Sequence, residues 1–311
     1  MFARQKSHFL PGNDPFQTDP NSNIDIGRVD FHAHSTASDG DLTPSELVEA
    51  ALAAGLAGLA LTDHDTVDGL PEFMEAAARR GLKAFGGVEI SLEHSGTMHL
   101  LGLNVNGGPE IPAALGSLKT FRVERNLKMQ DRLGEMGYRL PWDQLLAKAR
   151  GGQMGRPHFA SLLMEKGYFK SREEVFDKLL GKGRPGYVDK KRLSPAEGLA
   201  MLRRAGWAPV LAHPVSLGLE ADQWAAYIEY MADMGLVGLE TRHPSLNQEQ
   251  TEFFQGLARR FNLVETAGSD FHNRCKPLAG LEWVRGNSPL GWEMLEGLRE
   301  RMAVTENVSG F

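Results

Sequence analysis

The chain has 311 residues, 41% of them hydrophobic and 24% charged, which fits a folded globular protein with one sizeable α/β domain. Its one cysteine, Cys275, excludes an intramolecular disulfide and a thiolate metal cluster, and favours a reducing, cytoplasmic compartment. The most apolar stretch, residues 47–62, contains Glu49 and two glycines, so we expect no membrane span and no signal peptide.

Strand and helix patterns alternate along the first third of the chain. Residues 1–26 are polar and are expected to form a tail. A capping box, Thr43-Pro44-Ser45-Glu46, opens a helix that is expected to reach about Ala54. The alternation predicts a mostly parallel sheet or barrel. Strands are expected at residues 28–32, 58–62, 83–91 and 97–103, with a further helix at 68–80.

The pattern changes at residues 109–190, which are helical, basic and broken by Gly-rich turns. From Lys119 to Arg192 there are 18 Lys and Arg against 9 Asp and Glu, a charge of +9. The remainder has 16 against 31, a charge of −15. This charge fits a solvated helical face or a positive lid that attracts an anionic substrate. We interpret the segment as a basic helical insertion between two parts of one domain, residues 27–108 and 191–311.

The strand and helix pattern resumes at a second capping box, Ser194-Pro195-Ala196-Glu197, and ionisable side chains follow the expected strands. Further strands are expected at residues 208–212, 236–240 and 263–267. The carboxyl ends of parallel strands share one rim, and buried ionisable groups there are costly unless they are paired or bind a metal. His32 and His34 alone would fit a hydrogen-bonded pair equally well. Together with the other clusters, they predict a metal site with nitrogen and oxygen ligands.

Five segments occur in the order DFHAHSTASDG, TDHDT, GVEIS, LAHP and GSDFH. They resemble the motifs of the polymerase and histidinol phosphatase (PHP) family. The resemblance spans residues 30–272 and implies an α/β fold, a distorted (β/α)7 barrel with two or three divalent metal ions at the strand ends. The segments GRPHFASLLMEKG and EEVFDKLLGKGRPGYV are similar to one branch of that family. Its members include 3′,5′-nucleotide bisphosphate phosphatases and a 5′→3′ exoribonuclease that acts on short RNAs.

The resemblance implies three metal positions. The first would use His32, His34, Glu89 and Asp270, the second Asp39, His64 and His272, and the third Glu89 with His99 and His213. Histidinol phosphatases of the family usually carry His in place of Asp39, so this chain is closer to the nucleotide branch. Mixed imidazole and carboxylate ligands suit Mn²⁺, Zn²⁺ or Fe²⁺, and Mn²⁺ is the expected ion.

Cations of the insertion are candidates for binding the substrate. Arg156, Lys182 and Arg184 each lie beside Gly or Pro, and a guanidinium binds phosphate bidentately. His158 and His243 are the candidates to protonate the leaving oxygen, although either could instead bind phosphate or cap a helix. Asp63 and Asp65 flank His64 and are expected to orient metal ligands.

These residues predict a metal-dependent phosphoesterase. It would release the 3′-phosphate of 3′,5′-bisphosphonucleotides such as pAp by means of a metal-bridging hydroxide, with the insertion binding the second phosphate. The alternatives are a 5′→3′ exoribonuclease for short 5′-monophosphorylated RNA, a C–N hydrolase of amidohydrolase type and a non-catalytic metal-binding module. The overall acidity argues against extended nucleic-acid binding, and no DNA-binding module is expected. The expected partner is a small anionic nucleotide or a short RNA.

Overall fold

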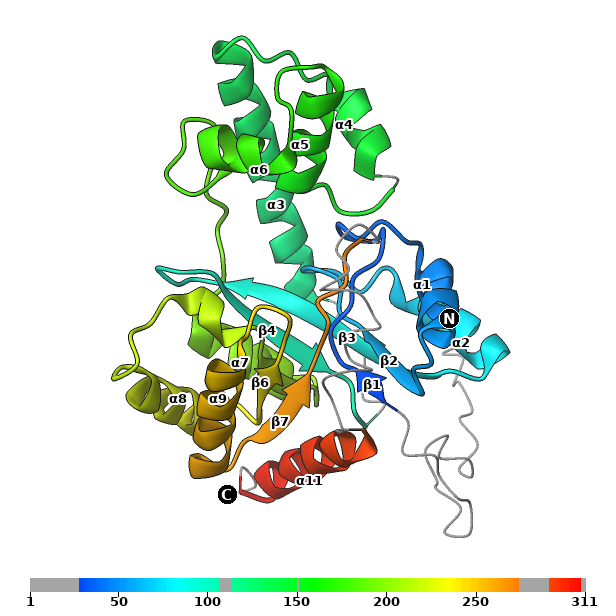
Figure 1. The fold of residues 1–311 in the computed structure, drawn as a ribbon, viewed down its shortest axis with the longest axis vertical. Helices are drawn as coiled ribbons and strands as arrows, with labels where there is room; N and C mark the ends of the chain where they lie inside the picture. Colours follow the sequence, from blue (N-terminus) through cyan, green and yellow to red (C-terminus); the bar gives the residue numbers. More distant parts are fainter. Residues whose placement is uncertain (1–27, 107–112, 150, 274–290, 309–311) are drawn as a thin grey trace, which may run out of the picture.

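The computed structural model describes residues 28–106, 113–149, 151–273 and 291–308, so the expected tail and Cys275 lie outside the described residues. Seven strands in chain order form one sheet that wraps into a nearly closed barrel (Figure 1). Phe31 N donates to Ala267 O at 3.1 Å, and Ala33 bridges Phe271, so the two ends of the sheet meet. The expected seven strands are therefore present. They are β1 (Val29–Asp30), β2 (Gly58–Leu61), β3 (Lys83–Leu92), β4 (Met98–Leu103), β5 (Ala208–Leu211), β6 (Gly238–Arg242) and β7 (Val264–Ala267).

Strand β4 runs antiparallel to both of its neighbours, whereas the other strand pairs are parallel. Residues 93–97 are too few to form a crossover helix, so β3 and β4 can only pair as a hairpin. The reversal places the start of β4 at the same rim as the carboxyl ends of the parallel strands, and His99 pairs there with Ser91. The sheet is mostly parallel, as predicted, with this one strand reversed.

Helices cover the outside of the barrel and one of its ends. Both predicted capping boxes are present. The side chains of Thr43 and Ser194 each accept from the backbone N–H three residues on, and their own backbone N–H groups donate to the carboxylates of Glu46 and Glu197. The helices are α1 (Pro44–Ala53), α2 (Leu70–Arg80), α7 (Pro195–Arg204), α8 (Trp224–Asp233), α9 (Gln248–Arg260) and α11 (Trp292–Val308), with a 3-10 turn η2 (Pro214–Leu217).

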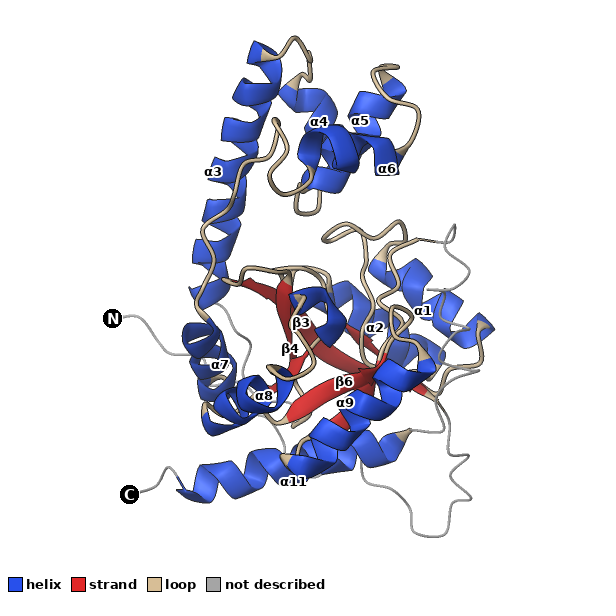
Figure 2. Cartoon of the chain, turned by 60° about the vertical axis from the view of Figure 1, so that its left-hand side comes forward, coloured by secondary structure: helices blue, strands red, loops and turns tan. Residues whose placement is uncertain are grey.

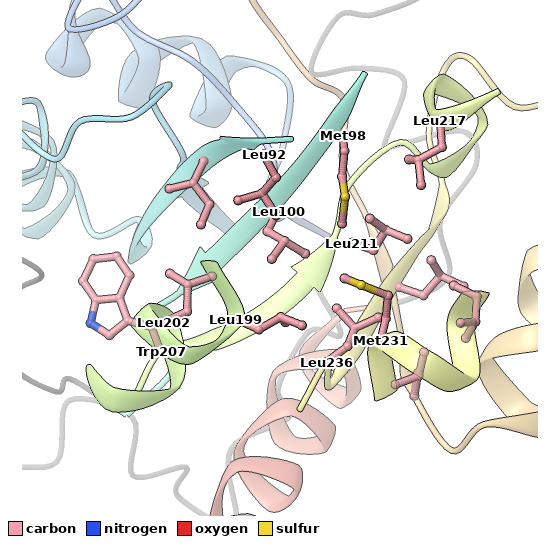
Figure 3. Close-up of a cluster of buried hydrophobic side chains, with 14 of the residues drawn as sticks. Leu92, Met98, Leu100, Leu199, Leu202, Trp207, Leu211, Leu217, Met231 and Leu236 are labelled. Atoms are coloured by element: carbon pink, nitrogen blue, oxygen red, sulfur yellow. The ribbon is translucent and has the colours of Figure 1, made fainter. Parts of the chain in front are cut away.

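The hydrophobic core leaves the rim free for polar groups. Figure 3 shows Leu92 and Leu100 of the sheet packed with Leu199 of α7 and Met231 of α8. Helix α11 packs Met294, Leu295 and Leu298 onto a second cluster that includes the first residue of β1. Each fully buried Leu in these clusters stabilises the fold by about 2 kcal/mol. Helix α11 therefore covers the amino-terminal end of the barrel, opposite the rim that carries the polar groups.

The basic insertion lies beyond this open rim in both views (Figures 1 and 2). Its long helix α3 rises from the barrel, and the shorter helices pack beside its far end. These elements share their own buried cluster, which includes Met129, Leu133, Leu145, Phe159 and Leu163. No helix within the described ranges is long and apolar enough to cross a membrane. The elements are α3 (Ala113–Glu135), α4 (Trp142–Ala149), α5 (Arg156–Glu165), α6 (Arg172–Val175) and a π-helical turn η1 (Phe176–Leu180).

Candidate metal centre and basic pocket

The carboxylate of Glu89, on β3, is fully buried at the centre of the rim. Imidazoles from separate parts of the chain surround it. The distances to its Oε2 are 2.9 Å from His64 Nδ1, 3.2 Å from His34 Nε2 and 3.3 Å from His32 Nε2, and those to its Oε1 are 2.7 Å from His99 Nδ1 and 2.9 Å from His213 Nε2. One buried carboxylate therefore contacts five histidines.

The structure brings together all nine side chains that were assigned to metal binding, which we call the rim cluster. Three sets of ligand atoms each lie within 4.8 Å of one another: His32, His34, Glu89 and Asp270; His34, Asp39, His64 and His272; and His64, Glu89 and His99. These sets match the expected division, with His34 added to the second position and His64 to the third. His213 joins the third set through Glu89 and lies 3.1 Å from His99. Their role as metal ligands stays a prediction.

Divalent metal ions fit the rim cluster. Several of its buried atoms make no hydrogen bond, among them His32 Nε2, His34 Nε2, Asp39 Oδ1 and Glu89 Oε2. A buried polar atom without a partner is costly, and bound cations would satisfy all of these atoms at once. The donors are imidazole nitrogens and carboxylate oxygens, which suit Mn²⁺, Zn²⁺ and Fe²⁺ without selecting among them.

The carboxylates of the rim cluster are held in their charged form. Burial alone would raise the pKa of Glu89, but His64, His99 and His32 hold it well below its usual range. Burial acts in the same way on Asp270, whose pKa His272 and His32 lower strongly. The carboxylates are therefore ionised at neutral pH and ready to bind cations.

A basic pocket of about 290 Å³ opens beside the rim cluster, between the barrel and the insertion. His64, His99 and Asp39 form its floor. Arg156 and Lys182 line it, whereas the exposed Arg184 lies outside the lining residues. The phosphate-binding role of all three stays a prediction. Four cations that the sequence reasoning missed also line the pocket: Arg122, Arg125, Lys190 and Arg192.

Arg125 differs from the other cations of the pocket. It is only 6% exposed, its Nε makes no hydrogen bond, and no carboxylate pairs with it in the described part of the chain. Burial, with Arg122 and Arg156 close by, lowers the pKa of Arg125 to about 9. By contrast, Arg192 pairs with Asp189 at 2.6 Å. A buried cation without an anion marks a place where an anionic ligand would be stabilised.

The two candidate proton donors lie on different sides of the rim cluster. His158 lines a second pocket of about 470 Å³ together with Asp39. Its Nδ1 accepts from Gly155 N–H at 2.9 Å, which places the proton of the neutral ring on Nε2. His243 Nε2 lies 3.6 Å from Asp270 Oδ2, and its Nδ1 contacts Ser245 Oγ at 2.7 Å. Both rings can donate a proton, and the assignment of either as the donor to a leaving oxygen stays a prediction.

Comparison of the sequence with known proteins identifies a family and relatives whose names fit a metal centre that acts on phosphate esters. The PHP domain family matches residues 30–175. A 5′-3′ exoribonuclease of Haemophilus influenzae is 33% identical over 250 residues, which cover 80% of this chain and 91% of that protein. The chain belongs to the PHP domain family. A 3′,5′-nucleoside bisphosphate phosphatase of Chromobacterium violaceum is 35% identical over 250 residues, 79% of this chain and 88% of that protein.

A solved structure extends the PHP likeness to the fold. An amidohydrolase from Chromobacterium violaceum has a TM-score of 0.76 and 32% sequence identity, and the match covers 87% of this chain and 96% of that one. The structural match therefore extends over most of the chain.

Two buried carboxylates hold side chains and loops of the rim cluster in this PHP barrel. Glu240, in the middle of β6, lies 3.1 Å from His32 Nδ1 and accepts from His213 N at 2.6 Å. With Nδ1 held as the donor, His32 can present only Nε2 to a metal ion. Asp30 accepts from the backbone N–H of His32 and of Ser269, both at 3.0 Å, and so joins the first and last ligand loops. The sequence reasoning missed Glu240, although an acidic residue at the end of the expected apolar strand, residues 236–240, was the available signal.

We expect Glu240→Gln to weaken metal binding about 10- to 100-fold, because loss of an outer partner lets the ligand ring turn and lowers its basicity. Metal retained after dialysis against a graded chelator series measures the effect. Glu265→Gln, on the neighbouring strand β7, is the matched control, because Glu265 contacts Arg259 at 3.3 Å away from the rim. Equal metal retention in both variants would contradict the positioning role of Glu240.

The backbone of the PHP rim is strained at two members of the rim cluster and at Asp65 beside a third. Asp65, His213 and Asp270 adopt left-handed φ angles of 53°, 26° and 50°. Such angles are energetically unfavourable for non-glycine residues, and several residues with these angles at one place are typical of a functional site. Gly268 is required for a different reason, since a Cβ there would lie 2.3 Å from His32 Cβ.

Proposed function

We propose that this PHP phosphoesterase releases the 3′-phosphate of 3′,5′-bisphosphonucleotides such as pAp. The rim cluster would bind the scissile phosphate, and the basic pocket would bind the 5′-phosphate. The observation that carries the proposal is Arg125, a buried cation without an anionic partner among the described residues. It lies in a pocket that Asp39, His64 and His99 of the rim cluster also line. The relative from Chromobacterium violaceum that is named a 3′,5′-nucleoside bisphosphate phosphatase supports the same choice.

The reaction adds the oxygen of water to phosphorus, breaks the P–O3′ bond and leaves a proton on the 3′ oxygen. Divalent ions held by the rim cluster would act as Lewis acids that neutralise the phosphoryl oxygens and make water a nucleophile near neutral pH. The protein supplies the position of both phosphates. His158 Nε2–H or His243 would protonate the leaving oxygen. Arg156 is fixed for phosphate binding, because its guanidinium lies over the rings of Phe176 and Tyr187, 6.0 and 5.3 Å from their centroids.

A second candidate is a 5′→3′ exoribonuclease that takes short 5′-phosphorylated RNA. The specific observation in its favour is the larger pocket of about 470 Å³ beyond Asp39, which shares Asp39 and Pro157 with the basic pocket. A 5′-terminal nucleotide in the basic pocket would leave this second pocket free for the rest of the strand. The relative from Haemophilus influenzae carries the corresponding name.

The test compares phosphate release from pAp with mononucleotide release from a short 5′-phosphorylated RNA, each with Mn²⁺, Zn²⁺ or Fe²⁺. Asp39→Ala, which removes a carboxylate from the rim cluster, is the inactive reference. Fast release from pAp that is lost in this variant supports the phosphatase. RNA that shortens from its 5′ end while pAp stays intact supports the exoribonuclease instead. If the metal-loaded protein hydrolyses neither substrate, both proposals fail.

A further inference from the structure

Asp65 joins the barrel to the insertion at several points. It directly follows His64 on the rim, and its side chain is fully buried. Its Oδ2 accepts from Arg122 Nη2 and from Lys190 Nζ, and its Oδ1 accepts from the backbone N–H of Ser91 at 3.0 Å. Its backbone carbonyl accepts from Gln153 Nε2 at 3.1 Å. These partners come from four separate parts of the chain.

The partners from the insertion span its whole length. Arg122 lies on α3 where the insertion begins, Gln153 lies in the loop between α4 and α5, and Lys190 lies where the chain returns to the barrel. A single residue of the rim thus holds the entry, the middle and the exit of the insertion. Sequence reasoning expected Asp65 to orient metal ligands, whereas its side chain bonds to two cations of the insertion and to the backbone of β3.

The charge of Asp65 is what allows this arrangement. Arg122 and Lys190 have side chains that are only 10% exposed, and both reach the same carboxylate oxygen. Two buried cations that contact the same oxygen atom would repel each other strongly without the negative charge between them. Removal of one member of a buried ionic group leaves the remaining charges uncompensated, which is far more damaging than loss of a surface ion pair.

We propose that Asp65 is the positioning residue that fixes the insertion above the rim cluster and thereby sets the distance between the two phosphate sites. Arg122 and Lys190 line the basic pocket with Arg125 and Arg156, so displacement of the two anchors displaces the pocket. The inference about specificity rests on the proposed function. The inference that Asp65 holds the insertion does not depend on it.

Asp65→Asn isolates the charge. Asparagine tolerates the left-handed φ of 53° at this position, and its amide oxygen can still accept from Ser91 N–H. Asp68→Asn is the matched control, since Asp68 lies three residues away and pairs with Lys119 of the same helix α3 at 2.6 Å, but in an exposed position. Metal content measured in both proteins shows whether the rim cluster is intact.

Two measurements test the proposal. The first is the ratio of kcat/KM for pAp to kcat/KM for 3′-AMP, which lacks the 5′-phosphate. We expect Asp65→Asn to lower this ratio about tenfold or more, chiefly through the KM for pAp, and Asp68→Asn to leave it unchanged. The second is amide hydrogen exchange, which needs no turnover. Exchange should become faster in the insertion of Asp65→Asn, at residues 113–135 and 151–165, while the barrel strands keep their protection.

Other outcomes overturn the proposal. An unchanged ratio with unchanged exchange means that Asp65 does not position the insertion. An equal loss for both substrates together with lost metal means that Asp65 acts on the rim cluster. If the wild-type protein hydrolyses neither substrate, the proposed function fails, and the exchange measurement still decides the role of Asp65. Should Asp65→Asn not fold, Lys190→Gln releases only the exit of the insertion, and unchanged exchange at residues 186–194 would then contradict the proposal.

Discussion

Glu89→Gln is expected to abolish measurable hydrolysis, with a loss of more than about a hundredfold, because even outer partners of metal ligands cost 10- to 100-fold. Glu89 takes part in two of the three ligand sets, as His34 and His64 also do, and its carboxylate contacts five imidazoles. The amide keeps the shape of the side chain but cannot neutralise a cation or accept through both of its terminal atoms. Metal content and turnover should therefore fall together.

The control for this prediction is Glu93→Gln. Glu93 follows β3 directly and is exposed, so its substitution removes one negative charge from the same strand end without touching the rim cluster. Wild-type protein treated with a chelator should lose activity as Glu89→Gln does, and added Mn²⁺ should restore only the wild type. Metal-dependent turnover by Glu89→Gln at a rate close to that of the wild type would show that metal binding and hydrolysis do not need Glu89.

The grouping of the rim cluster could be predicted from sequence because its side chains lie at or near strand ends. A polar side chain directly after a short apolar strand, as in His64 or His213, has a position that follows from the parallel topology alone. His99 lies at this rim for a different reason. It lies near the start of β4, and only the reversal of that strand brings it to the same rim. The short link at residues 93–97 could have predicted this reversal, because it has no room for a crossover helix.

The basic pocket could be predicted only in part, because it is assembled across long sequence separations. Arg122 and Arg125 are three residues apart on one face of α3, but nothing in their spacing shows that this face meets the rim. Lys190 reaches Asp65 from 125 residues away. The family resemblance favoured Arg184 as a phosphate contact, yet its Gly and Pro neighbours are equally typical of a turn that leaves the side chain in solvent, where Arg184 lies.

Arg125→Gln is expected to lower kcat/KM for pAp about 10- to 100-fold while hydrolysis of 3′-AMP changes by much less. The reason is that a hydrogen bond to a charged group is worth about 1.5–3 kcal/mol. The same variant should melt at a higher temperature than the wild type in the absence of ligand. Arg125 is buried without an anionic partner in the described part of the chain, so the folded protein bears the cost of an uncompensated charge. Glutamine removes that charge.

This pair of opposite changes distinguishes a ligand-binding arginine from one that holds the fold. A structural arginine would lose both stability and activity on substitution, for either substrate. Lys128→Gln serves as the control, because Lys128 lies on α3, three residues after Arg125, and is exposed to solvent. Arg184→Gln, measured in parallel, decides whether that exposed residue also contributes. Should Arg125→Gln melt at a lower temperature and lose pAp and 3′-AMP hydrolysis equally, the basic pocket would be a structural feature and the 5′-phosphate would bind elsewhere.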